Sequence, residues 1–137
     1  MTPLLFVYGT LLPDDRGAYG AVERARLAAE ADLVGLASTR GALLDLGDYP
    51  GLVEGDGVVH GAVYRLRDPA HTLAWLDAYE GVTGGHGDEY VRCVCEVTVA
   101  TKDYGSCWTY CYLQFKVDAA PIESGRWCLR SSGPAAL

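Results

Sequence analysis

The hydrophobic pattern of the chain changes period several times, and its short apolar runs between turn residues predict β-strands. Residues 4–8 form such a run, which ends at Gly9-Thr10, so we expect a buried first strand followed by a backbone turn. Residues 89–101 alternate in polarity, and residues 106–115 form an aromatic-rich partner after a turn at 102–105. Shorter strands are predicted at 33–37, 43–46 and 58–66.

Two segments are predicted to be helical. Residues 17–30 are rich in Ala, Glu and Arg, which suits a helix. The second helix is better marked, because Asp68 can cap the free amides, Pro69 fits the first turn and Gly81 suits the end. The sequence therefore predicts helices at about 17–30 and at 69–80.

Glu80 lies on the apolar face of the second predicted helix. Leu73, Leu76 and Glu80 are separated by three and four residues, so one face carries two large apolar residues and then a carboxylate. Burial and the negative end of the helix dipole would both raise the pKa of that carboxyl group. A raised pKa lets a carboxylate accept and return protons near neutral pH. A surface Glu that leans inward, or one paired with Arg92, explains the same spacing about equally well.

The order of the elements indicates the fold class. Six or so strands with only two helices predict an α+β fold with a curved mixed sheet that can close as a barrel. With 137 residues, half of them hydrophobic, the chain is expected to form a single domain over 1–137. Residues 118–137 show little periodicity, and we expect an ordered wrap that ends in a frayed tail.

Composition narrows the classes of partner. The net charge of -7, from 11 basic and 18 acidic residues, disfavours nucleic-acid binding by counterion release. The same excess of carboxylates also helps to keep a small protein in solution. No stretch approaches the roughly 20 apolar residues that cross a bilayer, and residues 1–3 lack the basic region of a signal peptide. We therefore expect a cytoplasmic protein with no nucleic-acid or membrane partner.

The cysteines do not follow a metal-binding pattern. No C-x-x-C pair occurs, and no His stands at a metal-site spacing from a Cys. We expect no metal and no cofactor, and we expect the thiols to pack as small apolar side chains in a reducing compartment. A reactive thiol is a second possibility. The five residues are Cys93, Cys95, Cys107, Cys111 and Cys128.

The turn after the first strand is a candidate binding site. Where a strand leads into a helix, exposed backbone N–H groups can bind an anion such as a carboxylate, and Gly9 would let a ligand approach closely. A simple strand end gives the same sequence pattern. Tyrosine hydroxyl groups at the edge of the aromatic strand, such as that of Tyr110, can orient a polar substrate.

Several separated segments together resemble the gamma-glutamyl cyclotransferase family, in its short bacterial and gamma-glutamylamine cyclotransferase branch. Each segment is short, but their order and spacing are specific and span most of the chain. They are residues 6–11, 48–53, 60–64, 76–81, 89–92, 108–110 and 122–127.

The resemblance implies a small mixed β-barrel flanked by helices. It also implies a lyase- or transferase-type enzyme that releases 5-oxoproline and a free amine from a gamma-glutamyl amine, by attack of the substrate's own alpha-amine. Glu80 would be the catalytic acid and base, and residues 8–11 would bind the amino-acid end of the glutamyl group. The residues expected to contact the substrate are Tyr8, Gly9, Thr10, Leu11, Tyr49, Pro50, Gly51 and Tyr110.

The chain departs from the family pattern at residues 12–19. Asp14 and Asp15 stand where the family has a stretch with a basic residue, a glycine and an Asn-His pair. Two carboxylates beside the pocket mouth can select a cationic leaving group such as an amine or aminoglycoside, although an exposed loop is the plainer alternative. A thioester on an acyl carrier protein in antibiotic biosynthesis is an alternative substrate, and a catalytically idle binding protein is an alternative of another class.

Overall fold

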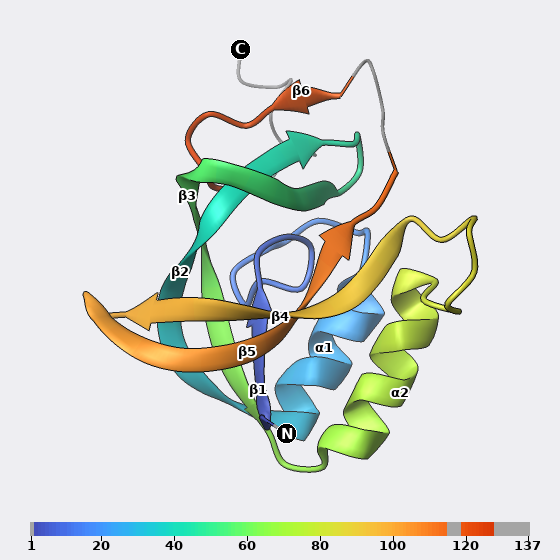
Figure 1. The fold of residues 1–137 in the computed structure, drawn as a ribbon. Helices are drawn as coiled ribbons and strands as arrows, with labels where there is room; N and C mark the ends of the chain where they lie inside the picture. The colour runs from blue at the N-terminus through green and yellow to red at the C-terminus, as the bar shows by residue number, and fades with distance from the viewer. Residues whose placement is uncertain (1, 115–118, 128–137) are drawn as a thin grey trace.

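The structure, a computed structural model, describes residues 2–114 and 119–127. Six strands form one sheet in the order β1-β3-β5-β4-β2-β6. Two further pairings, of β1 with β5 and of β3 with β2, close the sheet into a barrel-like ring (Figure 1). The strands are β1 Leu4–Val7, β2 Ala31–Asp45, β3 Pro50–Leu66, β4 Tyr90–Val99, β5 Lys102–Tyr112 and β6 Ala120–Pro121.

The sheet is mixed because β1 pairs with two strands that run in opposite directions. β1 runs antiparallel to β3 and parallel to β5, where Leu5 is level with Trp108. The helices α1 Ala21–Glu30 and α2 Pro69–Glu80 lie side by side on the outside of the ring (Figure 1). The predicted α+β fold, a small mixed β-barrel flanked by helices, is confirmed.

Helix α2 has the ends that the sequence predicts. The Asp68 carboxylate accepts a hydrogen bond from the N–H of His71 at 3.3 Å, and Pro69 occupies the first turn. Gly81 ends the helix in the left-handed region, with φ of 72°, and its N–H donates to the carbonyl of Ala78 at 3.2 Å. Helix α1 begins later than predicted, at Ala21, because Gly20 before it also has a left-handed φ of 76°.

Three of the predicted strand and turn boundaries are wrong. The strand predicted at 58–66 begins much earlier, at Pro50, so that β3 pairs with β2 along most of its length. The short strands at 33–37 and 43–46 are parts of one strand, β2, which continues through a register shift between Arg40 and Ala42 without a turn. The hairpin between β4 and β5 turns at Ala100 and Thr101, both with positive φ, and residues 102–105 already belong to β5. Such a two-residue turn matches the twist of its strands, but it contains none of the Gly or Asn that normally reveals it.

The far end of the chain is described only in part. β6 pairs with β2 at Leu44 and Asp45, which agrees with an ordered wrap. The predicted frayed tail lies largely outside the described residues.

The core consists of two apolar clusters, and β1 separates them. Leu5 and Val7 pack with Leu76 of α2 in the cluster beneath the helices. Phe6, which points to the opposite side of the strand, packs with Val63 in the other cluster. β1 is therefore buried on both faces, as predicted, and the turn after it is held close to helix α2.

Two cysteines are linked, which corrects the expectation of free thiols. Cys93 and Cys111 form a disulfide with their Cα atoms 6.6 Å apart. Cys93 is level with Thr109 in the hairpin, so Cys111 lies diagonally opposite on the same face, a relation that depends on the register and not on the cysteine count. Cys95 and Cys107 are free, and burial raises their pKa to about 11 and about 12. Cys128 lies outside the described residues.

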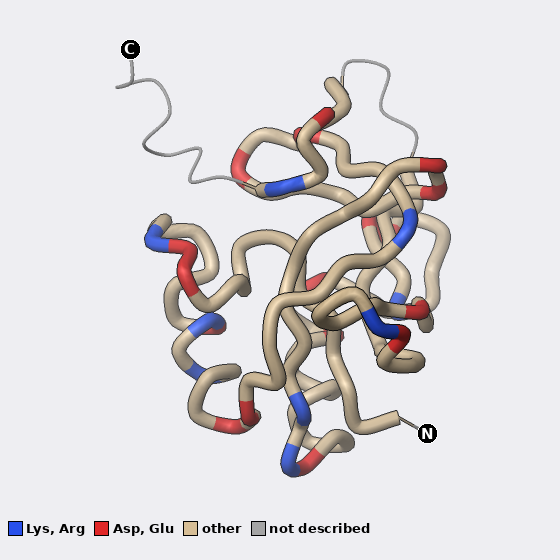
Figure 2. The backbone as a smooth tube through the Cα atoms, turned by 90° about the vertical axis from the view of Figure 1, so that its left-hand side faces the viewer, with Lys and Arg blue, Asp and Glu red and all other residues tan. Residues whose placement is uncertain are grey.

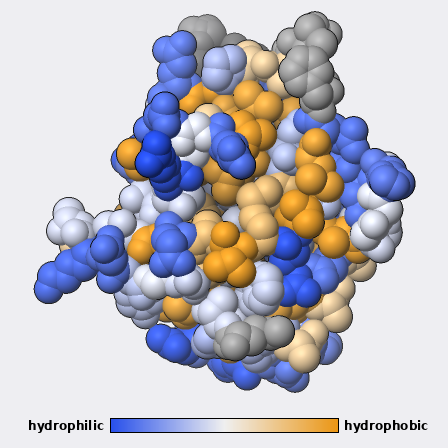
Figure 3. Space-filling model, in the orientation of Figure 1, coloured by the Kyte–Doolittle hydropathy of each residue, from blue (hydrophilic) through white to orange (hydrophobic). Residues whose placement is uncertain are grey.

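The surface mixes charges and apolar groups. Basic and acidic residues are interspersed along the chain in Figure 2, and apolar and hydrophilic patches alternate on the face in Figure 3. Within residues 2–114 and 119–127, neither helix has the length and apolar character that spanning a membrane requires.

Candidate active site

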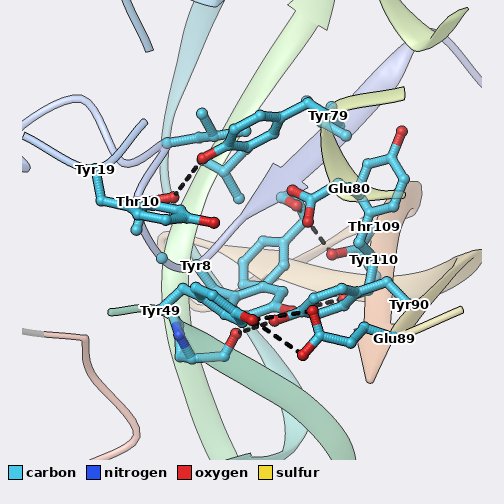
Figure 4. A pocket seen from close by; sticks show the side chains of 16 residues that line it. Tyr8, Thr10, Tyr19, Tyr49, Tyr79, Glu80, Glu89, Tyr90, Thr109 and Tyr110 are labelled. Atoms are coloured by element: carbon cyan, nitrogen blue, oxygen red, sulfur yellow. Dashed lines mark hydrogen bonds between the residues drawn. The ribbon is translucent and has the colours of Figure 1, made fainter. Parts of the chain in front are cut away.

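A pocket of about 80 Å³ opens where the end of β1, the end of α2 and the hairpin strands β4 and β5 meet (Figure 4). A single water needs only about 10–15 Å³ of such volume, so the pocket has room for a ligand of several heavy atoms. Of the nine residues predicted from sequence to be catalytic or substrate-binding, the structure brings eight to the pocket wall. These are Tyr8, Gly9, Thr10, Leu11, Tyr49, Pro50, Glu80 and Tyr110.

Gly51 is the predicted residue that does not line the pocket. It lies in β3 against the side chain of Tyr112, where a Cβ atom would come within 2.8 Å of the Tyr112 Cβ. Its place in the structure is therefore in the packing behind the pocket wall.

The turn after β1 lines the pocket with residues whose backbone N–H groups are not used within the described part of the fold. Leu12 N–H closes the turn on the carbonyl of Gly9 at 2.9 Å. Within the described ranges, the N–H groups of Gly9, Thr10 and Leu11 donate no hydrogen bond, so they can receive an anionic ligand. A Cβ atom on Gly9 would lie 2.7 Å from Cγ of Pro50, so this position has no room for a larger residue.

Two contacts fix the conformation of this turn. The guanidinium of Arg24 donates to the carbonyls of Thr10 at 2.8 Å and Gly17 at 2.7 Å. The hydroxyl groups of Thr10 and Tyr79 lie 3.3 Å apart, and Tyr79 is the residue before Glu80. The turn is thereby tied directly to the end of helix α2.

Tyr8 is part of the pocket wall, and its hydroxyl group is bound on both sides. Its hydroxyl donates to the carbonyl of Tyr110 at 2.6 Å and accepts from the N–H of Leu52 at 3.2 Å. The hydroxyl of Tyr110 in turn donates to the carboxylate of Asp77 at 2.6 Å. Because both hydroxyl groups are engaged with protein, these tyrosines hold the walls in place.

Glu80 is the last residue of α2, and its carboxylate points into the pocket (Figure 4). Burial raises its pKa from 4.5 to about 7, and the negative charge of Glu89 adds to the rise. In the described part of the chain, the Glu80 carboxylate takes part in no hydrogen bond or ion pair. Arg92, the alternative partner left open by the sequence, binds Asp77 instead, with Nε and Oδ1 at 2.9 Å.

The lining of the pocket contains residues that sequence reasoning missed. Tyr19, Tyr79, Glu89 and Tyr90 all line it. The sequence offered weak signals: Tyr79 precedes Glu80, while Glu89 and Tyr90 begin the strand after a Gly-rich loop. Tyr19 lies within the helix predicted at 17–30, but α1 begins only at Ala21, and the loop before it places Tyr19 against Tyr49, with ring centroids 5.3 Å apart.

Asp14 and Asp15 do not lie at this mouth, which corrects the expectation that they stand beside the pocket. Asp15 is buried, accepts from the N–H of Gly17 at 2.7 Å, and lies 3.8 Å from Arg24. Asp14 lines a different groove, to which His60 also belongs. Asp15 therefore helps to hold the loop, and neither residue can select a substrate at this mouth.

The pocket offers acid–base and hydrogen-bonding chemistry. Its lining contains two carboxylates and several tyrosines, but no Lys, Arg, His, Ser or Cys. In the portion of the chain that the structure describes, no group of three or more His, Cys, Asp or Glu is arranged to hold a metal ion. The arrangement can bind a small zwitterion, with its anionic end on the turn amides and its cationic end near Glu80.

Comparisons with known proteins agree with the fold and the sequence. The sequence model of the gamma-glutamyl cyclotransferase, AIG2-like family matches residues 5–129. A Vibrio cholerae protein named as a gamma-glutamylcyclotransferase is 39% identical over 132 residues, which cover 95% of this chain and 99% of that relative.

Two solved structures share the fold. The solution NMR structure of ytfP from Escherichia coli has a TM-score of 0.63 at 36% identity, covering 93% of this chain and 98% of that one. The crystal structure of YkqA from Bacillus subtilis has a TM-score of 0.69 at 23% identity, covering 100% of this chain and 44% of that one, and it shows the fold alone. With most of its length matched by the family model, the chain belongs to the gamma-glutamyl cyclotransferase, AIG2-like family.

Proposed function

We propose that the protein is a cyclotransferase that releases 5-oxoproline and a free amine from a gamma-glutamyl amine, with Glu80 as general acid and base. The observation that carries the proposal is the Glu80 carboxyl group in the pocket, with a pKa raised to about 7 and no partner among the described residues. At neutral pH such a group is divided between its two protonation states, so it can both take and return a proton.

The charges of a gamma-glutamyl group match the two ends of the pocket. Its alpha-carboxylate is placed on the free N–H groups of the turn after β1, since no basic side chain lines the pocket. Its alpha-ammonium then lies near Glu80. Two attachment points fix the glutamyl chain, and its gamma-carbonyl carbon is already tethered to the attacking nitrogen.

The reaction needs no covalent enzyme intermediate. Glu80 takes a proton from the alpha-ammonium, and the free amine attacks the gamma-carbonyl carbon to form the five-membered ring. The protonated Glu80 then gives its proton to the departing nitrogen as the old carbon–nitrogen bond breaks. The same carboxylate takes a second proton from the ring nitrogen and passes it to the released amine. In total, the alpha nitrogen loses two protons and the leaving nitrogen gains two, so that it departs as an ammonium.

The walls around Glu80 favour this chemistry by keeping water away. The rings of Tyr8, Tyr79 and Tyr110 surround the pocket beside the carboxylate (Figure 4). A setting of low polarity disfavours a bare carboxylate and strengthens its attraction for the substrate ammonium.

The test is the Glu80→Gln variant, assayed by mass spectrometry for 5-oxoproline. We expect it to fold and to lower turnover by about 10²–10⁴-fold, the range typical of general acid–base catalysis. Glu54→Gln is the matched control, because Glu54 is exposed on β3 and does not line the pocket. Unchanged release of 5-oxoproline by Glu80→Gln would overturn the proposal.

The same assay, repeated with several substrates, identifies the leaving group that the protein accepts. Gamma-glutamyl amines, gamma-glutamyl dipeptides, glutathione and a gamma-glutamyl thioester of a carrier protein are compared side by side. Release from the amines alone is the expected result. Release from the thioester alone would replace the proposed substrate, and no release from any of them would favour a binding protein.

A further inference from the structure

The outer part of the pocket differs from its inner part in exposure and charge. Glu80 and the turn after β1 lie inside, whereas Glu89 is exposed and Tyr19 is 46% exposed. If the glutamyl group occupies the inner part, as the proposed function requires, the leaving amine extends outward past Tyr19, Tyr49 and Glu89 (Figure 4).

Glu89 is held in position at this mouth. The hydroxyl of Tyr49 lies 2.9 Å from each of the two carboxylate oxygens of Glu89. One hydroxyl proton shared between two oxygens leaves most of the acceptor positions of the carboxylate free. The carboxylate therefore keeps a defined place and can still accept hydrogen bonds from a cation.

The surroundings of Glu89 are negative. Burial raises the pKa of Tyr19, and the charges of Glu80, Glu89, Asp48 and Glu23 raise it further. The arginines near the pocket are engaged elsewhere: Arg24 binds backbone carbonyls of the turn, and Arg92 binds Asp77.

The exposed aromatic ring adds a second attraction for a cation. Tyr19 packs against Tyr49 at 5.3 Å and against Tyr79 at 6.5 Å between ring centroids. An ammonium group beside an exposed tyrosine face is stabilised by the ring, and a carboxylate next to the ring adds to that effect.

We propose that Tyr19, Tyr49 and Glu89 form a subsite for a second positive charge on the leaving amine, so that the preferred substrates are gamma-glutamyl derivatives of diamines. This inference rests on the proposed function and specifies its leaving group. A leaving group with a carboxylate, such as that of glutathione, would meet repulsion at the same place.

The experiment compares two substrates that differ in one terminal group. Gamma-glutamyl-diaminobutane carries a second ammonium, and gamma-glutamyl-butylamine ends in a methyl group. The ratio of their kcat/KM values isolates the terminal charge, because both share the same reacting bond. An exposed ion pair contributes up to about 1 kcal/mol, which corresponds to a preference of about fivefold for the diamine, and the aromatic contact adds to it.

Two charge-removing variants locate the effect. Glu89→Gln should lower the ratio to the smaller preference that the aromatic contact alone provides. Any effect of this variant on the reaction step is common to both substrates and cancels in the ratio. Asp14→Asn removes another exposed carboxylate, one that does not line this pocket, and it should leave the ratio unchanged. Tyr49→Phe, which loses the hydroxyl that holds Glu89, should lower the ratio in part.

The outcomes separate this subsite from the proposed function. Equal kcat/KM values for the two substrates in the wild-type protein would overturn the subsite while leaving the cyclotransferase reaction in place. An equal fall of the ratio in Asp14→Asn and Glu89→Gln would also overturn it, since the preference would then come from overall charge. Failure of the wild-type protein to release 5-oxoproline from either substrate would contradict both proposals.

Discussion

Replacing Glu80 by Gln should make the protein more stable at alkaline pH while lowering its activity. The fold holds this carboxyl group away from water, and its pKa rises from 4.5 to about 7. Gln has nearly the same shape and carries no charge. The variant therefore avoids the free-energy penalty of burying a charged carboxylate.

The direction and size follow from the shift in pKa. Below about pH 4.5 the carboxyl group is neutral in both the folded and the unfolded chain, so wild type and variant should not differ through it. Between that pH and about 7 the unfolded chain releases its proton and the folded chain keeps it. The wild type then loses about 1.36 kcal/mol of unfolding free energy per pH unit. Above pH 7 the loss is constant, at about 3 kcal/mol for the full shift.

Urea unfolding at about pH 4 and about pH 8 measures this difference. We expect Glu80→Gln to exceed the wild type by up to about 3 kcal/mol at the higher pH and to match it at the lower pH. Glu54→Gln, on an exposed site, should show no such pH-dependent gain. A Glu80→Gln variant no more stable than the wild type at pH 8 would refute a charge penalty in the pocket.

Two further predictions concern the scaffold of the pocket. Gly9→Ala should lower the unfolding free energy by about 1–3 kcal/mol, because the added methyl group would lie 2.7 Å from the Pro50 ring. It should also lower kcat/KM for a neutral gamma-glutamyl amine. Unchanged stability and activity would contradict this tight contact. Reduction of the Cys93–Cys111 disulfide, which closes a loop with a sequence separation of 18, should lower the unfolding free energy by about 3 kcal/mol; a Cys93→Ser, Cys111→Ser variant that keeps the full stability of the oxidised protein would contradict it.

The sequence was most informative where local rules decide the structure. The ends of helix α2 follow from Asp68, Pro69 and Gly81, since capping and left-handed termination depend on neighbouring residues. The inward position of Glu80 follows from helical spacing alone. The sequence does not show that Glu80 lacks an arginine partner, because this depends on the tertiary contact between Arg92 of β4 and Asp77.

Features that depend on strand register or on tertiary contacts could not be predicted from the sequence. The Cys93–Cys111 link requires a diagonal pairing across β4 and β5, and neither residue spacing nor cysteine count reveals it. The position of Asp15 was also misjudged, because a loop aspartate that looks exposed in sequence binds Arg24 and the loop backbone in the fold. Tyr19 reaches the pocket through the same loop, whose path is set by tertiary contacts.

Other expectations stay predictions: a single domain over 1–137, a cytoplasmic location, and the identity of any partner. The fold and the family are secure from the match over residues 5–129 and the barrel-like sheet. The chemistry of the pocket depends on one ionisable group.

The most direct test of the account is therefore an NMR titration of the Glu80 side-chain carboxyl carbon in the free protein, assigned by its absence in Glu80→Gln. The account predicts a midpoint at about 7, well above the ordinary value of 4.5. A midpoint near 4.5 would mean that the carboxyl group is in contact with water, and it would contradict the role of Glu80 as the acid and base of the pocket.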